Sequence, residues 1–210
     1  MSRMFLDVRF DNPFQTNCWA LSADGSDEAV VVDPGFNPAG VKEMVERSGR
    51  RIAAVLATHG HADHIASAPQ VCDPDIPLYI HEADELALTD QGAWGAGMPV
   101  PDRYRPREVR TVADGDTLGF AGFEIRVRHT PGHTPGSVCF ATDGFLLSGD
   151  LVFRDSIGRH DFPNSNARDM FESLRWFLTL DDGIDVYPGH GPETTVGRER
   201  ARNEWLKALV

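Results

Sequence analysis

Three histidines and an aspartate lie within six positions, in the stretch LATHGHADHI at residues 56–65. Residues two apart on a helix point about 160° away from each other, whereas on an extended segment they share a side. The spacing of His59, His61 and Asp63 therefore predicts a loop or strand end, and His64 turns back from the start of the next helix. Neutral imidazoles and a carboxylate are ligands that suit Zn, Fe or Mn, so the stretch predicts a metal site.

Three further ionisable residues follow apolar runs in glycine-rich segments. His133 lies between two Pro-Gly pairs in HTPGHTPGS, Asp150 ends the run LLSGD, and His190 follows DVYPG. Loops at strand ends are where residues distant in sequence can meet in a site. Together with the first cluster, these residues predict two metal positions of three or four ligands each, with a shared carboxylate.

Two such metals would make a hydrolase. Metals about 3.5–4 Å apart can share a bridging hydroxide and polarise an acyl or phosphoryl oxygen, and bound water ionises at a pKa near 7. The residues alone therefore predict metal-assisted hydrolysis, without naming the bond that is cleaved.

Composition narrows the class of protein. The chain has 210 residues, 41% of them hydrophobic and 25% charged, which suits a single domain over 1–210. The net charge of −12 argues against a nucleic-acid partner. Three scattered cysteines without a CxxC pair predict a reducing, cytoplasmic setting. Because the N-terminus is charged throughout, we do not expect a signal peptide. The sequence has no run of about 18 apolar residues, so we expect no membrane span.

Elements that would position these residues can be read from hydrophobic periodicity and turn residues. Their order predicts one layered α/β domain. Residues 90–108 are expected to form an irregular loop or a flap. Its arginines either attract an acidic substrate or form a solvated face; they are Arg103, Arg105 and Arg107. The predicted strands are 4–10, 16–22, 29–33, 51–58, 76–80, two about the turn at 119–122, two about the turn at 143–144, and 185–188; the predicted helices are 37–49, 81–88, 167–178 and 194–210.

The motifs resemble those of a known family. THGHADH resembles the T-H-x-H-x-D-H signature of the metallo-β-lactamase fold superfamily, and PGHTPGS, SGD and PGHG resemble its later His, Asp and His motifs. Within it, HTPGHTPGSVCF, SIGRHDFPNSN and GHGPETTVGRER are similar to small bacterial glyoxalase II-like hydrolases. The resemblance implies a four-layer αβ/βα sandwich with the metals at one edge.

It also implies a ligand set with two divalent metal ions, of which Zn is expected first and Fe or Mn next. Asp63 would orient the hydroxide and Asp150 would bridge, so these two are the expected catalytic residues. The implied ligands are His59, His61 and His133 at one metal and Asp63, His64 and His190 at the other, with Asp150 shared.

The same resemblance implies a small-molecule substrate, a thioester of the S-2-hydroxyacylglutathione type. Arg159 is a candidate for binding a substrate carboxylate, and its alternative is a salt bridge to Asp161 or Asp155. His160, which stands where similar enzymes read Thr in GRTD, either faces the cleft or faces solvent. Larger glyoxalase II enzymes carry a C-terminal helical domain that helps to bind glutathione, which we do not expect in a sequence that ends at residue 210. The oligomeric state is not predicted.

Other functions stay open. A related persulfide dioxygenase would hold one Fe(II) with His59, His133 and Asp150, since two histidines and a carboxylate leave positions open for oxygen. A non-catalytic scaffold would hold a structural metal in a closed shell. A β-lactamase is not expected, because a carboxylate stands at 150 where the common enzymes have cysteine. Asp33 is either a hydrogen-bond partner of a ligand histidine or part of an Asx turn.

Overall fold

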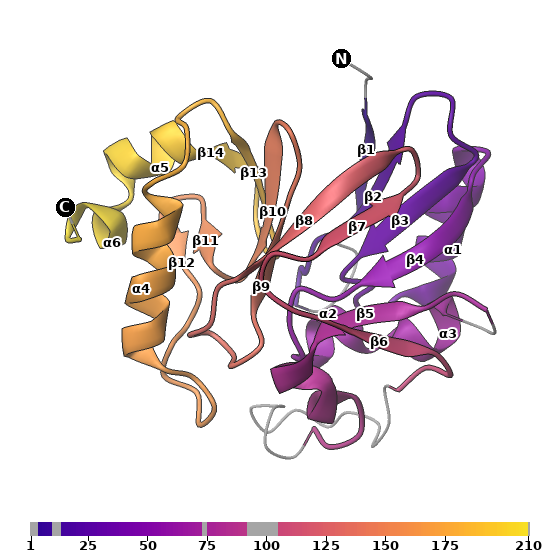
Figure 1. The fold of residues 1–210 in the computed structure, drawn as a ribbon, viewed down its shortest axis with the longest axis horizontal. Helices are drawn as coiled ribbons and strands as arrows, with labels where there is room; N and C mark the ends of the chain where they lie inside the picture. Colours follow the sequence, from indigo (N-terminus) through magenta and orange to yellow (C-terminus); the bar gives the residue numbers. More distant parts are fainter. Residues whose placement is uncertain (1–3, 10–13, 73–74, 92–104, 210) are drawn as a thin grey trace.

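The computed structural model describes residues 4–9, 14–72, 75–91 and 105–209, and two six-stranded sheets dominate it (Figure 1). The first sheet has the order β1-β2-β3-β4-β5-β6. Its first three strands pair antiparallel and the next three join in parallel. The strands are β1 (Met4–Arg9), β2 (Cys18–Ala23), β3 (Glu28–Val32), β4 (Arg51–Leu56), β5 (Leu78–His81) and β6 (Val109–Val112).

The second sheet has the order β14-β13-β10-β9-β8-β7. Only β10 and β13 pair in parallel, and the remaining neighbours are antiparallel. The strands are β7 (Thr117–Phe120), β8 (Phe123–His129), β9 (Val138–Ala141), β10 (Phe145–Gly149), β13 (Asp185–Pro188) and β14 (Thr194–Thr195), and a separate hairpin joins β11 (Val152–Phe153) to β12 (Ser156–Ile157).

Helices cover the outer face of each sheet, so the described chain has four layers (Figure 1). Three hydrophobic clusters separate the layers: one under the helices of the first sheet, one between the sheets, and one under the helices of the second sheet. The expected αβ/βα sandwich is therefore confirmed. The helices are α1 (Pro38–Arg47), α2 (Ala62–Ile65), α3 (Ala68–Val71) and the 3₁₀ helix η1 (Glu82–Leu88) on one side, and α4 (Ala167–Phe177), α5 (Val196–Arg202) and α6 (Glu204–Lys207) on the other.

Strand β3 shows why the sequence produces two cores. Successive side chains of a strand point to opposite faces, and Val30 and Val32 enter the cluster between the sheets while Ala29 and Val31 enter the cluster under the helices. All four are fully buried. A strand covered on both faces must be continuously apolar rather than alternating, which is why AVVV is an uninterrupted run.

The structure differs from the sequence prediction in several places. Strand β6, helix α3 and the hairpin of β11 and β12 were not predicted, because each is too short to show a clear period. Thr194–Thr195 form strand β14 where the sequence predicted the start of a helix. The C-terminal segment is not one helix: Asn203 is extended and caps the next turn by accepting from the Trp205 N–H. Most of the predicted flap, residues 92–104, lies outside the described residues. The assignment of 1–210 to a single domain stays a prediction.

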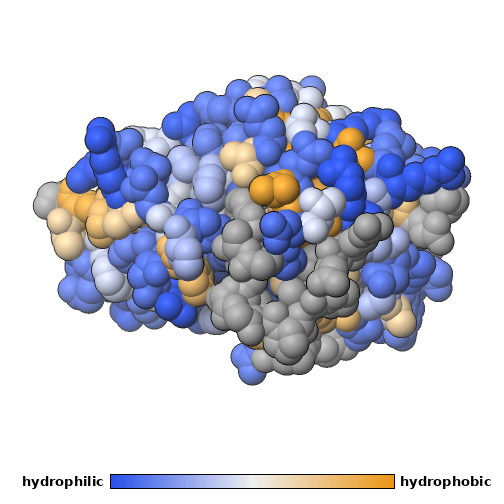
Figure 2. Space-filling model, turned by 90° about the horizontal axis from the view of Figure 1, so that it is seen from below, coloured by the Kyte–Doolittle hydropathy of each residue, from blue (hydrophilic) through white to orange (hydrophobic). Residues whose placement is uncertain are grey.

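The outside of the molecule reflects its acidic composition. On the described part of the face in Figure 2, hydrophilic residues predominate and hydrophobic residues gather in small patches. Among the described residues, no helix has the length and apolarity needed to cross a bilayer.

Candidate metal centre

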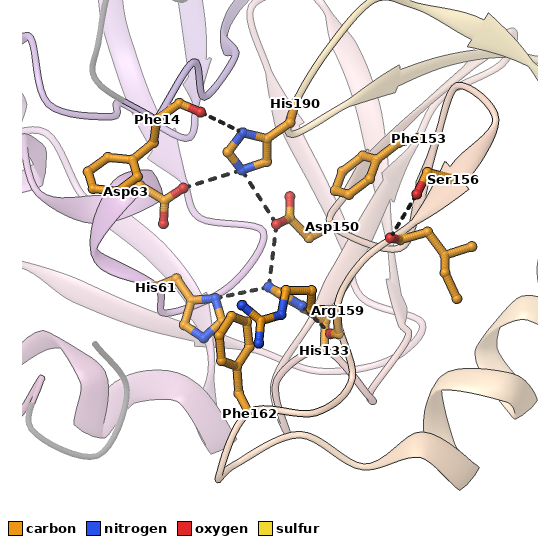
Figure 3. Close-up of a pocket in the computed structure, with 11 residues that line it drawn as sticks. Phe14, His61, Asp63, His133, Asp150, Phe153, Ser156, Arg159, Phe162 and His190 are labelled. Atoms are coloured by element: carbon orange, nitrogen blue, oxygen red, sulfur yellow. Dashed lines mark hydrogen bonds and ion pairs between the residues drawn. The ribbon is translucent and has the colours of Figure 1, made fainter. Parts of the chain in front are cut away.

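The structure brings all seven predicted ligands together at one edge of the sandwich, where strands of both sheets end. His59 and His61 follow β4, His133 follows β8, and His190 follows β13. Asp63 and His64 lie on α2, and Asp150 comes directly after β10. Figure 3 shows five of these residues turned toward one another from segments far apart in the sequence.

One group consists of three imidazoles. His61 Nδ1 lies 3.1 Å from His59 Nε2 and 2.9 Å from His133 Nε2. These three nitrogens lie within 4.8 Å of one another, and all three side chains are buried. Three ring nitrogens that face a common point are arranged as the ligands of one cation.

A second group combines a carboxylate with two imidazoles. Asp63 Oδ2 lies 3.5 Å from His64 Nε2 and 3.2 Å from His190 Nε2, and the three atoms again fall within 4.8 Å. The hydroxyl of Thr16 donates to the same carboxylate oxygen at 3.0 Å, which fixes the orientation of Asp63.

Asp150 lies between the two groups. Its Oδ2 is 3.4 Å from His133 Nε2 and 3.5 Å from His190 Nε2, while Oδ1 is 3.6 Å from His64 Nε2. One carboxylate thus reaches a member of each group, as a bridging ligand must.

Asp33 and Thr58 hold the Nδ1 atoms of His64 and His59, the ring nitrogens that point away from the metal centre. His64 Nδ1 donates to Asp33 Oδ2 at 2.9 Å, which decides between the two interpretations of Asp33. The hydroxyl of Thr58 donates to the same oxygen at 2.8 Å and lies 3.1 Å from His59 Nδ1. A hydrogen bond to the far nitrogen fixes the tautomer, so that Nε2 carries a lone pair toward the centre.

Backbone carbonyls do the same for the other two Nε2 ligand candidates. His133 Nδ1 donates to the carbonyl of Arg159 at 2.7 Å, and His190 Nδ1 donates to the carbonyl of Phe14 at 3.1 Å. Each ring therefore presents its remaining nitrogen to the cluster in the basic form that binds a metal.

The carboxylates of the cluster stabilise positive charge at their histidine neighbours. Burial opposes protonation of His64, but the carboxylates of Asp63, Asp150 and Asp33 outweigh it and raise its pKa to about 9. Burial likewise opposes the charging of His190, yet hydrogen bonds and charge from Asp150 and Asp63 raise its pKa to about 11. Two buried carboxylates must be neutralised by protons or by a cation.

Buried polar atoms of the centre that lack a hydrogen-bond partner among the described residues test whether a cation fits there. His64 Nε2 and Asp150 Oδ1 are buried without a hydrogen-bond partner among the described residues. Buried polar atoms are rarely left unpaired, and a cation would satisfy both. The imidazole and carboxylate donors fit divalent Zn, Fe or Mn, so the residues present fit divalent metal ions.

A cavity of about 440 Å³ opens onto the centre. Its walls combine ligand candidates with three aromatic rings and the β11–β12 hairpin (Figure 3). Arg159 lies at the wall, where it forms a bidentate ion pair with Asp161 and stacks on Phe162 at 4.2 Å. The cavity is lined by Phe14, His61, Asp63, His133, Asp150, Phe153, Ser156, Ile157, Arg159, Phe162 and His190.

The structure does not bring His160 to this cavity. Its ring packs against Phe171 and Trp205, with ring centroids 5.5 and 5.8 Å away. Its neighbour Arg159 lines the cavity instead.

Sequence reasoning missed several residues of the site. The hydroxyls of Thr16 and Thr58 hydrogen-bond to the ligand candidates Asp63 and His59, and Phe14, Phe153 and Phe162 form cavity walls. Thr58 stands directly before His59, which was a usable signal. The aromatic residues lie in segments without a motif, and only the fold shows that they meet.

Known proteins with similar sequences point to one family. A family model described as the metallo-beta-lactamase superfamily matches residues 11–190. A protein of Mycobacterium leprae is 39% identical over 208 residues, covering 93% of this chain and 95% of the relative. Hydroxyacylglutathione hydrolase GloC of Haemophilus influenzae is 32% identical over 208 residues, covering 93% and 94%.

Solved structures give the same result. The BLEG-1 B3 metallo-beta-lactamase has a TM-score of 0.87 and 32% identity, covering 96% of this chain and 99% of that one. TTHA1623, solved in a di-iron-bound form, has a TM-score of 0.82 and 32% identity with the same coverage. ETHE1 from Myxococcus xanthus has a TM-score of 0.78 and 26% identity, covering 97% and 85%.

Proposed function

Because the chain belongs to the metallo-beta-lactamase superfamily of metal-dependent hydrolases, we propose that it is a binuclear thioester hydrolase of the hydroxyacylglutathione hydrolase type. The observation that carries the proposal is the pair of three-ligand groups with Asp150 between them. The similarity to GloC supports the thioester as the bond cleaved. The three free and buried cysteines support the cytoplasmic setting that we propose with it.

The proposed metal ligands are the seven residues of the sequence prediction: His59, His61 and His133, then Asp63, His64 and His190, with Asp150 shared. Two bound divalent cations would supply hydroxide at neutral pH and polarise the thioester carbonyl. We propose Zn as the resident metal, with the di-iron form of TTHA1623 marking Fe as its competitor.

The protein residues contribute positioning. Asp63 lines the cavity and is fixed by Thr16, so its carboxylate can orient the attacking hydroxide by accepting a hydrogen bond from it. The aromatic walls exclude bulk water from the thioester. Arg159 can pair with a substrate carboxylate in exchange for Asp161, since its guanidinium is exposed at the cavity wall.

The test combines metal analysis with an assay. Protein purified without added metal is expected to carry close to two divalent ions per chain and to hydrolyse S-D-lactoylglutathione. His190→Gln should lose one metal and most of the activity, whereas His160→Gln, a histidine outside the cavity, should retain both. Fully loaded protein without turnover would overturn the thioester, and nitrocefin tests the β-lactam alternative raised by the BLEG-1 similarity.

A second candidate function is an Fe(II) persulfide dioxygenase. The observation that favours it is the proximity of His133 and Asp150 at 3.4 Å, with His59 in the same cluster, because this set matches the two-histidine, one-carboxylate facial arrangement. One iron per chain with oxygen uptake on a persulfide substrate would select this function. Two metals per chain with oxygen-independent hydrolysis would select the first.

A further inference from the structure

Asp84, on η1, is a buried carboxylate that neither metal position uses. It is 0% exposed. Its Oδ2 accepts from the Gly60 N–H at 2.8 Å and from the Thr134 hydroxyl at 2.7 Å, and its Oδ1 accepts from the Gly136 N–H at 2.6 Å. Two separate loops thus donate hydrogen bonds to one carboxylate. Oδ2 faces the backbone of the Gly60 loop, and Oδ1 faces the backbone of the Gly136 loop.

Both loops carry members of the same metal position. Gly60 lies between His59 and His61, after β4 of the first sheet, and Thr134 follows His133, after β8 of the second sheet. Asp84 therefore ties together the two loops that must meet for the three imidazoles to converge.

Both loops pack tightly against η1 at two glycines, Gly60 and Gly136. A Cβ at Gly60 would lie 2.5 Å from the Cβ of Ala87, and a Cβ at Gly136 would lie 2.5 Å from Oδ1 of Asp84. Close approach of both backbones to η1, at Ala87 and at Asp84 respectively, is the reason for glycine at these two positions. Burial raises the pKa of Asp84 to about 6, although its hydrogen bonds oppose that rise, so the carboxylate is kept there at a cost in stability.

The second metal position is held by other contacts. His64 is fixed by Asp33, and Asp63 by Thr16. His190 is fixed by the carbonyl of Phe14. None of these three contacts runs through Asp84.

We propose that Asp84 is a positioning residue that sets the distance between His133 and the pair His59 and His61, and so controls the affinity of the three-histidine metal position alone. This inference rests on the proposed binuclear centre. An isosteric amide cannot replace the carboxylate, because Asn has one acceptor oxygen and its NH₂ group would face an N–H or O–H donor. Depending on the orientation of the amide, either the Gly136 N–H or the Gly60 N–H would lose its acceptor.

The experiment is metal titration of the metal-free full chain with Zn²⁺. In Asp84→Asn we expect one equivalent to bind as in the wild type and the other to bind about 10–100-fold more weakly. Asp116→Asn is the matched control, because Asp116 also accepts a backbone N–H but lies at an exposed turn. It should bind both equivalents normally.

Double variants identify which position is weakened. Asp84→Asn should add nothing to the loss caused by His61→Ala, and its effect should add to that of His190→Ala. Equal weakening of both equivalents, or none, would overturn the role of Asp84. A wild-type chain that binds no Zn²⁺ would instead overturn the proposed centre itself.

A second variant covers the case in which Asp84→Asn fails to fold. Gly136→Ala pushes on the same carboxylate from the other side and should weaken the same equivalent. Gly119→Ala, with open space around the added methyl group, is its control. Unchanged Zn²⁺ binding in folded Gly136→Ala would contradict the proposal.

Discussion

His64 Nδ1 donates a hydrogen bond to Asp33 Oδ2 at 2.9 Å, and both side chains are buried. Asp33 has a left-handed backbone, with φ of 53°, a conformation that Asp and Asn tolerate better than most residues. The turn after β3 therefore sets a carboxylate directly behind a ligand candidate. The contact fixes the ring of His64 and leaves Nε2 facing Asp63 and Asp150.

Replacement of Asp33 by Asn tests this contact, because the backbone preference is retained while one acceptor oxygen is lost. We expect Zn²⁺ affinity at the Asp63, His64 and His190 position to fall about 10–100-fold, measured by competition with a chelating dye. Asp143→Asn, at an exposed position, is the control. Full affinity in Asp33→Asn would show that the backbone, rather than the carboxylate, orients His64.

The stability of the metal-free protein should depend on pH. The folded-state pKa of His64, raised to about 9 by its carboxylate neighbours against the effect of burial, gives stability that is full below the unfolded value near 6.5 and is lost as pH rises through 9. Burial lowers the pKa of His61 to about 3, so this group loses stability as pH falls below 6.5.

Together these shifts predict a maximum of Tm near pH 6.5 for the metal-free protein, with a fall of several degrees by pH 9. A bound cation replaces the proton on His64, so the metal-loaded protein should show no such fall. Thermal unfolding at pH 6.5 and 9, with and without Zn²⁺, makes the comparison. A metal-free Tm that rises toward pH 9 would contradict the assignment of charge to His64.

Gly189 tests the placement of Asp150. A Cβ at this position would lie 2.3 Å from Asp150 Oδ1 and 2.8 Å from His64 Cε1. Gly189→Ala should displace the carboxylate between the two ligand groups and lower kcat by about 100-fold, since a misplacement of about 1 Å can cost that much. Gly144→Ala, which has open space, should retain wild-type kcat. Normal turnover in folded Gly189→Ala would exclude a bridging role for Asp150.

The seven ligand candidates could be found in the sequence because of where they stand. Each follows an apolar strand or begins the helix after it, as Asp150 does after β10, and strand ends on one edge must lie near one another. The same runs predicted a layered α/β domain, because continuous apolar segments such as residues 29–32 indicate strands that are buried on both faces. The four-layer arrangement was implied by the family resemblance.

Contacts that depend on tertiary packing could not be predicted. Asp84 is one acidic residue in the helical stretch EADELAL, and nothing in that pattern indicates that loops from two sheets donate to it. His160 and Arg159 are adjacent in sequence, but only the packing of Trp205 shows which of them faces away from the cavity. The break at Asn203 was missed because a helical period continues through it while its side chain bonds to Ser156 and Glu199.

Glu199 gives a prediction about the cavity wall. It is fully buried, and its carboxylate accepts from the backbone N–H of Asp155, in the turn of the β11–β12 hairpin, and from Asn203. Arg198 and Thr194 donate to its other oxygen. The carboxylate therefore attaches to α5 the hairpin that supplies Phe153, Ser156 and Ile157 to the cavity.

Glu199→Gln puts an amide NH₂ opposite two of these donors and should destabilise the fold by about 2–3 kcal/mol. Because the hairpin lines the cavity but provides none of the proposed ligands, we expect KM for the thioester to rise several-fold while metal content stays at the wild-type value. Glu172→Gln, an exposed i,i+4 partner of Arg168, should cost less than about 0.5 kcal/mol and leave KM unchanged. Urea unfolding and steady-state kinetics measure both effects, and a loss of metal with unchanged KM would show that Glu199 supports the ligands rather than the wall.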